Sequence, residues 1–336
     1  MDKIKERFGP VDIPESRLFC HPSRIGNIYE PGVEEVIQQR SIIPEDELSL
    51  SIKRGQTPDY VQLVKGGPGK KWRTWRESLG RRGGYDFGER LIYDARRSFN
   101  GNMAHLIHEH MVILGYVKAK LGYGNKDVIV VMDNQAPSLA IKVFSAIGYE
   151  TCLTNLPVAG NLLSIQLEET RYLLPSLAAL DIVGWIESTP PKVFISRKDT
   201  RKLVNETDVM AMLNEHGYER YFFDDLSVME QWSLLRNASS VVATHGAALG
   251  CLAFHSCKQE KGPIELIELL SPGLVANVFR KYMAILGGKW VGCRGRLTPE
   301  VIRDIDNPSK YKDRAYDDYT LAPSVIKSAM NYLGQH

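Results

Sequence analysis

The chain has 336 residues, 43% of them hydrophobic, which is long enough for two domains that each bury a core. Its net charge of +2 comes from 42 basic and 40 acidic residues, a balance that argues against a nucleic-acid-binding protein. The five cysteines lack C-x-x-C spacing, and the sequence contains neither an apolar signal core nor the ~18 apolar residues of a membrane span. These features argue against a cysteine zinc site and a disulfide framework and predict a cytoplasmic protein.

The first half of the chain alternates helical and strand patterns after a weak start. Before residue 85 the pattern is weak, and the Gly-rich basic segment 65–82 is either a solvated loop or a contact with an anionic membrane surface. Beyond it, the sequence predicts a long amphipathic helix, a buried strand, a second helix and a second strand, at residues 101–122, 127–133, 136–149 and 150–156. Prolines at positions 175, 190 and 191 then mark a connection, so we place a domain boundary near residue 185.

The second half alternates more regularly. We expect strands at 192–196, 219–223, 240–244, 264–270 and 289–293, separated by helices at 207–216, 227–237, after His245, and at 274–286. The second of these helices opens on Ser227 with Glu230 three residues later, which is the spacing of a capping box. Strands that alternate with helices predict an α/β protein with a doubly wound parallel sheet.

The stretch "VVATHGAALG" predicts a ligand-binding turn between a strand and a helix. In doubly wound sheets, ligands lie at the carboxyl ends of the strands, where such turns expose backbone N–H groups. We expect Gly246 to let the backbone approach a ligand closely, with Ala247 and Ala248 leaving room and the helix start binding an anion. His245 adds a ring donor. The alternative is a tight turn whose small residues only permit close packing.

A basic cluster follows another strand of the same half. In "FISRKDTRKLVNE", Arg197 and Arg201 come after the strand that ends at residue 196, so they are expected at the same carboxyl edge as His245. Guanidinium groups bind phosphate oxygens in a bidentate fashion. Two anion-binding features at one edge favour a phosphate site over a solvated basic loop.

These residues resemble the signature of glycosyltransferase family 61. The resemblance covers roughly residues 99–291 and rests on "SRKDTRKLVNE", "LSVMEQWSLLRNASSVVATHGAALGCLAF", "IELIELLSP" and "NMAHLIHEH". The positions at the family's spacing are Arg197, Arg201, Asn205, Glu206, Glu230, Gln231, Ala238, His245, Gly246, Ala247 and Leu249, with Asn102, His105 and Glu109 in the first half. The sequence departs from the family at Gly250 and Cys251, where Thr-Asn is usual.

The resemblance implies a GT-B fold, with two Rossmann-like domains facing a central cleft. We expect an acceptor-side domain over 1–185, a nucleotide-sugar-binding domain over 186–300, and a tail over 301–336 that packs back on the first domain. The expected reaction is inverting transfer of xylose or N-acetylglucosamine from a UDP-linked sugar to a glycan acceptor, which is soluble, protein-borne or lipid-linked. Donor-binding roles then fall to Arg197, Arg201, Asn205, Glu206, His245, Gly246, Ala247, Ala248 and Glu268, the last contacting ribose or acceptor hydroxyls.

The acceptor hydroxyl needs a base. Asn102, His105 and Glu109 are spaced three and four apart and so share one helix face, with Asn102 lining the cleft. We expect His105 to be the base, with Glu109 orienting its ring or acting as the base itself, unless the pair is a hydrogen-bonded core element. Charge on the leaving group is stabilised by the arginines, so no metal or other cofactor is required.

No metal site is expected, because His108, Glu109 and His110 would point in different directions around an α-helix. Two other functions are compatible with the same binding features. One is a nucleotide-sugar epimerase, and the other is a non-catalytic nucleotide-sugar-binding scaffold, which the Gly250–Cys251 departure would favour.

Overall fold

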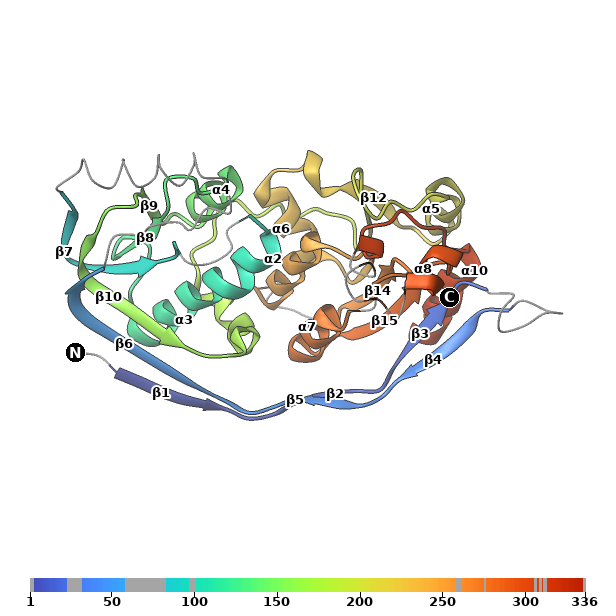
Figure 1. Ribbon diagram of the computed structural model, residues 1–336, viewed down its shortest axis with the longest axis horizontal. Coiled ribbons are helices and arrows are strands. Elements are labelled where there is room, and N and C mark those ends of the chain that lie inside the picture. The colour runs from blue at the N-terminus through green and yellow to red at the C-terminus, as the bar shows by residue number, and fades with distance from the viewer. Residues whose placement is uncertain are drawn as a thin grey trace. The chain divides into compact units, whose positions relative to one another are not determined.

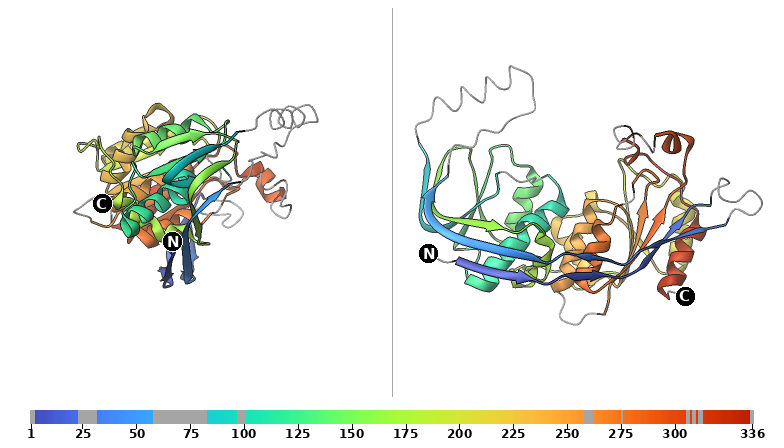
Figure 2. Two further views of the ribbon diagram at one scale, coloured as in Figure 1. Left: turned by 90° about the vertical axis from the view of Figure 1, so that its left-hand side faces the viewer. Right: turned by 60° about the horizontal axis from the view of Figure 1, so that its bottom comes forward.

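The computed structural model describes residues 3–22, 32–57, 83–96, 101–257, 262–274, 276–304, 307, 310 and 313–334. The chain forms two compact units, the first from residues 1–8 and 46–183 and the second from residues 9–45 and 184–336. Figures 1 and 2 show their elements. The basic segment 65–82, for which a membrane contact was considered, lies outside the described residues. Within the described part, no helix has the length and apolar character needed to cross a bilayer.

The first unit contains a six-stranded mixed sheet with the order β1-β6-β10-β7-β8-β9. Strands β10, β7, β8 and β9 run parallel, whereas β6 pairs antiparallel with both β10 and β1. The strands are β1 (Lys3–Phe8), β6 (Asp46–Gln56), β7 (Tyr85–Asp94), β8 (Val128–Met132), β9 (Glu150–Leu153) and β10 (Val158–Gln166). Every residue of β8 is buried, in agreement with its unbroken apolar run.

One continuous helical stretch in the first unit carries the candidate base. It consists of α2 (Met103–His105), the π-helix η1 (Leu106–Met111) and α3 (Val112–Leu121). The 3₁₀ helix η2 (Thr170–Ala179) packs against α3, and α4 (Ser138–Ala146) packs against β9. The helices and strands predicted between residues 101 and 156 are thus confirmed, but the middle of the long helix is π-helical.

The second unit contains a seven-stranded sheet with the order β12-β11-β13-β14-β15-β3-β4. All neighbouring strands are parallel except β3 and β4. The strands are β3 (Ser16–Cys20), β4 (Glu34–Gln38), β11 (Lys192–Ser196), β12 (Glu219–Phe222), β13 (Ser240–Thr244), β14 (Glu265–Leu270) and β15 (Lys289–Arg294). The parallel sheet predicted for the second half is confirmed, and β3 and β4 extend it from a part of the chain whose pattern was weak.

Helices of the second unit follow the predicted alternation. They are α5 (Glu206–Glu215), η3 (Phe223–Asp225), α6 (Val228–Asn237), η4 (Ala247–Cys257), α7 (Val278–Leu286), α8 (Pro299–Asp304) and α10 (Pro323–Leu333), and a two-stranded ribbon pairs β2 (Val11–Ile13) with β5 (Ser41–Ile43). The capping box of α6 is present, because Ser227 and Glu230 each accept from the other's backbone N–H. The helix after His245 is 3₁₀ rather than α.

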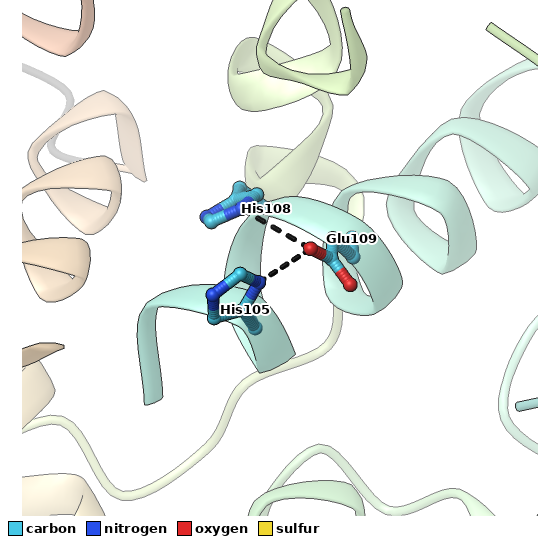
Figure 3. A group of neighbouring side chains, drawn as sticks. All are labelled: His105, His108 and Glu109. Carbon is cyan, nitrogen blue, oxygen red and sulfur yellow. Dashed lines mark hydrogen bonds and ion pairs between the residues drawn. The ribbon is translucent and has the colours of Figure 1, made fainter. Parts of the chain in front are cut away.

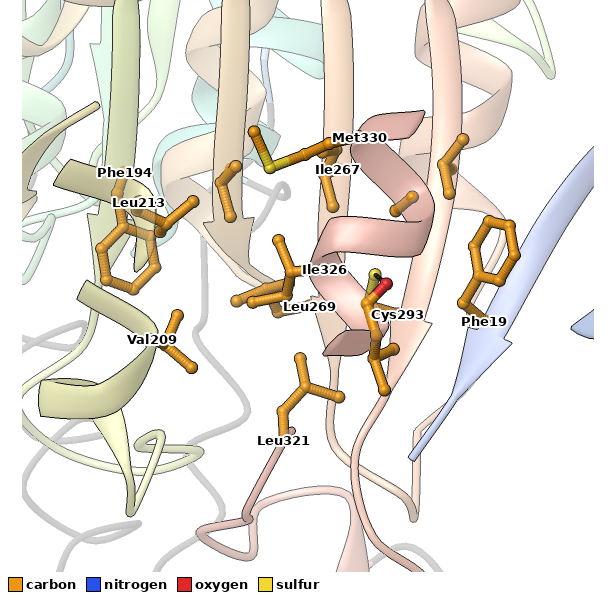
Figure 4. Close-up of a cluster of buried hydrophobic side chains, with 14 of the residues drawn as sticks. Phe19, Phe194, Val209, Leu213, Ile267, Leu269, Cys293, Leu321, Ile326 and Met330 are labelled. Carbon is orange, nitrogen blue, oxygen red and sulfur yellow. Dashed lines mark hydrogen bonds between the residues drawn. The ribbon is translucent and has the colours of Figure 1, made fainter. Parts of the chain in front are cut away.

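The last helix covers part of the second sheet. α10 lies against β15, β3 and β14 of the second unit (Figure 2). Its residues Val325, Ile326, Ala329 and Met330 are buried in the cluster that also contains Phe19, Phe194, Val209 and Leu213 (Figure 4). The spacing of these four helix residues forms one apolar stripe, which explains why the helix needs a sheet face to cover it.

Candidate functional site

Arg197 lies against the turn that follows β13. Its Nη1 donates to the backbone carbonyl of His245 at 3.3 Å, while Nε and Nη2 donate to Asp199 at 3.2 and 3.1 Å. A Cβ added at Gly246 would overlap Nη1 of Arg197. Gly246 is not among the glycines with positive φ, so the close approach of the guanidinium, rather than backbone conformation, requires a glycine here. The structure thus brings the two predicted anion-binding features together.

Arg201 is held in an unusual backbone conformation. Its φ is +59°, and it is the single non-glycine residue with a positive φ in the part of the chain that the structure describes. Its guanidinium lies 5.3 Å from the centre of the Tyr316 ring, and its Nε is buried without a hydrogen-bond partner among the described residues. Burial and the nearby charge of Arg197 both lower the pKa of Arg201. A strained backbone beside two like charges is typical of a ligand-binding site.

Asn205 and Glu206 fix the far end of this arginine loop. Asn205 forms a paired hydrogen bond with the backbone of Leu321, donating at 2.9 Å and accepting at 3.1 Å. Glu206 accepts from Ser196 and, at 2.8 Å, from Nη1 of Arg220. Both side chains were predicted to bind the donor. Here their hydrogen bonds attach the loop to the rest of the unit.

His245 is held by a buried carboxylate. Glu268 alternates along β14 with Ile267 and Leu269 of the core cluster, so it projects from the opposite face of the sheet. It is fully buried, and its two oxygens accept from Nδ1 of His245 at 2.5 Å and from Nε1 of Trp290 at 2.6 Å. The expected contact of Glu268 with ribose or acceptor hydroxyls is therefore not available in this conformation.

This carboxylate sets the direction of the His245 ring. With Nδ1 donating to Glu268, the ring presents Nε2 on its other side, and the His245 side chain keeps 14% of its surface exposed. An imidazole in this position accepts a hydrogen bond through Nε2 when neutral and donates one when protonated. Gly246, Ala247 and Ala248 follow at the start of η4, where the first N–H groups have no acceptor within the helix.

The N-terminal candidates lie together in the first turns of the helical stretch formed by α2 and η1. The side chain of Asn102 accepts from the backbone N–H groups of Ala104 and His105, at 2.9 and 3.4 Å, and so caps the helix. Nδ1 of His105 is hydrogen-bonded to Oε1 of Glu109, one turn later (Figure 3). Their side chains are 39% and 33% exposed, so this pair lies at the surface of its unit rather than in the core.

The surroundings of Glu109 lower its pKa and so distinguish its role from that of His105. Burial raises the pKa of Glu109, but hydrogen bonds from His108 and His105 outweigh it and lower the pKa to about 2. Such a carboxylate is a weak base near neutral pH, so its hydrogen bond to His105 serves to orient the imidazole ring. The neighbouring His110 is buried, and this burial lowers its pKa to about 4. It is therefore a neutral core histidine, bound to the hydroxyl of Tyr93 at 2.8 Å.

The side chains of the same helix also form a cluster of metal-ligand type. One ligand atom from each of His105, His108 and Glu109 lies within 4.8 Å of the other two, and this is the single group of its kind among the described residues. The expectation that His108 and Glu109 point in different directions is wrong, because they follow His105 by three and four residues and both lie on its side of the helix (Figure 3). Only His110 points away.

Three contributors to the candidate site were not predicted from the sequence. Asp199 pairs with Arg197 two residues earlier, and the local string "RKD" contains a signal for this pair. Trp290 and Tyr316 are brought to Glu268 and Arg201 by tertiary packing, and no local pattern points to either contact.

A protein-family model matches most of the chain. The family model described as Glycosyltransferase 61 matches residues 35–262. Among curated proteins, none matches the chain.

Two of the matching solved structures are crystal structures of TibC. One is the bacterial iron-containing dodecameric glycosyltransferase TibC from enterotoxigenic E. coli H10407, with 11% identity, 81% of this chain and 76% of that chain covered, and a TM-score of 0.32. The other is the dodecameric iron-containing heptosyltransferase TibC in complex with ADP-D-beta-D-heptose, with 13% identity, 56% and 61% covered, and a TM-score of 0.30.

Proposed function

Because the chain belongs to glycosyltransferase family 61 and is a glycosyltransferase, we propose that it transfers a sugar with inversion from a nucleotide sugar to a glycan hydroxyl. The proposed donor is UDP-linked, and the proposed sugar is xylose or N-acetylglucosamine, as the resemblance to the family implies. The acceptor receives a β linkage. The enzyme works in the cytoplasm in this proposal, in agreement with five cysteines that form no disulfide within the described residues.

The observation that carries the donor site is the packing of Arg197 against the Gly246 turn. Arg201 adds a second positive charge nearby, and Asp199 is the carboxylate that pairs with Arg197. A diphosphate would supply the negative charge that balances these two guanidiniums. It would also accept a hydrogen bond from Nε of Arg201, which has no partner among the described residues. The free N–H groups at the start of η4 lie in the same turn and suit phosphate oxygens.

The remaining donor-side residues support this site instead of touching the diphosphate. Glu268 orients His245, so that Nε2 of the ring faces the ligand. Asn205 and Glu206 hold the end of the loop that carries Arg201. These contacts fix the positions of the positive groups before the donor binds. The positive groups therefore stabilise the negative charge that grows on the leaving diphosphate without having to move, so no metal ion is required for transfer.

The base is His105 of the first unit. Its Nδ1 donates to Glu109, and Nε2 takes the proton of the acceptor hydroxyl. The acceptor oxygen then forms a bond to the anomeric carbon, the bond from this carbon to the diphosphate oxygen breaks, and the electron pair leaves with the nucleoside diphosphate. Transfer therefore requires the two units to bring base and donor together, as in the GT-B arrangement that the resemblance implies.

A donor screen followed by one variant tests this proposal. Thermal unfolding of the purified chain with a panel of nucleotide sugars should identify the donor, because a ligand that binds the native state raises the unfolding temperature. Slow release of nucleoside diphosphate from that donor, lost in Arg197→Ala, would support a transferase. Tight binding with no turnover would contradict catalysis and favour a scaffold, and release of an altered nucleotide sugar would identify an epimerase.

A further inference from the structure

The helix that carries the proposed base has a π-helical turn where three potential metal ligands meet. His108 and Glu109 follow His105 by three and four residues, a spacing that places side chains on one face of a helix. Both side chains therefore lie beside His105 (Figure 3). The hydrogen bonds of η1, which begins directly after His105, run from residue i to i+5. π-Helical turns are rare and occur frequently at functional sites.

The distances within this cluster are close to those of a metal site. Nε2 of His108 lies 3.6 Å from Oε1 of Glu109, and the same oxygen is hydrogen-bonded to Nδ1 of His105. In a tetrahedral zinc site with ligand bonds of ~2.0 Å, ligand atoms are ~3.3 Å apart. Small rotations of side chains already on one face of the helix would therefore give this spacing. The ligand atoms are accessible, since the His108 side chain is 17% exposed and the other two more than this.

The surroundings hold the ligands in place. The hydroxyl of Tyr93 donates to the backbone carbonyl of Glu109 at 3.2 Å and is bonded to His110, which keeps His110 turned into the core. Asn102 caps the N-terminus of the helix that carries His105 and His108. The ligands thus come from a capped, packed helix rather than from a loop.

Two imidazoles and one carboxylate form a ligand set that suits zinc and similar transition metals. Zinc takes this set with a fourth position open to water, whereas calcium and magnesium prefer sites made of oxygen ligands. A metal on Nε2 of His105 would occupy the nitrogen proposed to take the acceptor proton. A metal on Nδ1 would replace the hydrogen bond to Glu109 and leave the ring proton on Nε2, which could then accept no further proton. A bound metal would therefore remove the proposed base from the reaction.

We propose that His105, His108 and Glu109 bind one divalent transition-metal ion, represented by Zn²⁺, and that this binding inhibits sugar transfer. The metal site follows from the arrangement of the three side chains alone. The inhibition rests on the proposed function, because it requires His105 to act as the base.

Binding is measured first, on the full chain and without any donor. The protein is stripped with EDTA, dialysed, and titrated with Zn²⁺ by calorimetry or against a chromophoric chelator. We expect one zinc per chain, and His108→Ala should weaken it by more than ~10-fold, since even the loss of an outer-shell partner costs ~10–100-fold. His216→Ala is the matched control, because His216 is a histidine of the second unit bonded to the carbonyl of Met212. No zinc binding, or equal binding by His108→Ala, would overturn the site.

A second variant guards against misfolding of the first. His108→Gln keeps a polar side chain of similar length but removes the imidazole ligand, so it should lose zinc binding while keeping the unfolding temperature of the stripped protein. Equal zinc affinity in this folded variant would also overturn the site.

Inhibition is measured with the donor identified in the screen, and each protein is compared with its own zinc-free rate. Zn²⁺ should lower the transfer rate of the native chain at concentrations that fill the site, and His108→Gln should need more than ~10-fold more zinc for the same effect. Zinc that binds through His108 but leaves transfer unchanged would overturn the inhibition. Absence of transfer with every donor of the panel would instead count against the proposed function and not against the metal site, because zinc binding is measured independently.

Discussion

Gly246→Ala should weaken donor binding because the added methyl group displaces the side chain of Arg197, which is itself unchanged. A Cβ at position 246 would overlap Nη1 of Arg197, and unbonded contacts need about 3.5 Å, so the guanidinium must retreat by about 1 Å. This movement breaks its hydrogen bond to the carbonyl of His245 and misplaces the charge proposed to bind the diphosphate. The backbone at Gly246 is not in the left-handed region, so alanine introduces no strain of its own.

The expected size of the effect follows from the lost contact. Hydrogen bonds to charged groups contribute ~1.5–3 kcal/mol, and each ~1.4 kcal/mol is a tenfold change in the dissociation constant. We therefore expect Gly246→Ala to raise the donor dissociation constant by about 10- to 100-fold, measured by calorimetry. Arg197→Ala should have a similar effect. The double variant should be no weaker than Arg197→Ala alone, because both changes remove one interaction.

The matched control is Gly262→Ala, at a glycine of the same unit where an added Cβ meets no atom of the described residues within 4 Å. It should leave donor affinity unchanged, and thermal unfolding should confirm that all variants fold. Donor affinity equal to that of the native protein in Gly246→Ala would refute this reasoning. So would a double variant in which the two losses simply add, since Gly246 would then act independently of Arg197.

Other predictions concern the base, the metal requirement and the buried carboxylate. His105→Ala and Glu109→Ala should each keep donor affinity but lose turnover, and the variant that lacks the true base should lose ~10²–10⁴-fold. Near-full transfer in both variants would mean that this helix face has only a structural role. Transfer should continue in EDTA, since fixed protein charges oppose the diphosphate, and complete loss restored by manganese would contradict this. Glu268→Gln should lower the free energy of unfolding by ~1–3 kcal/mol in urea, because an amide cannot accept from both His245 and Trp290, and an unchanged midpoint would argue against that bonding.

Patterns within a few residues determined much of the fold. The alternation of apolar runs and helical periods located most elements between residues 101 and 294, because burial of a strand or a helix face depends on its own spacing of apolar side chains. The capping box of Ser227 and Glu230 was also predictable, since both hydrogen bonds close within one turn. The same locality placed Arg197 and His245 after neighbouring strands of the sheet.

Only the tertiary structure decided how these pieces meet. The contacts of Glu268 with His245 and Trp290 join residues more than twenty positions apart. The close approach of Arg197 to Gly246 brings together two turns that follow different strands. The π-helical turn at His108 and Glu109, and the placement of α10 on the second sheet, likewise follow from packing energy summed over many neighbours. Local propensities differ by less than ~1 kcal/mol per residue, so where burial of a large surface competes with them, the packed structure prevails.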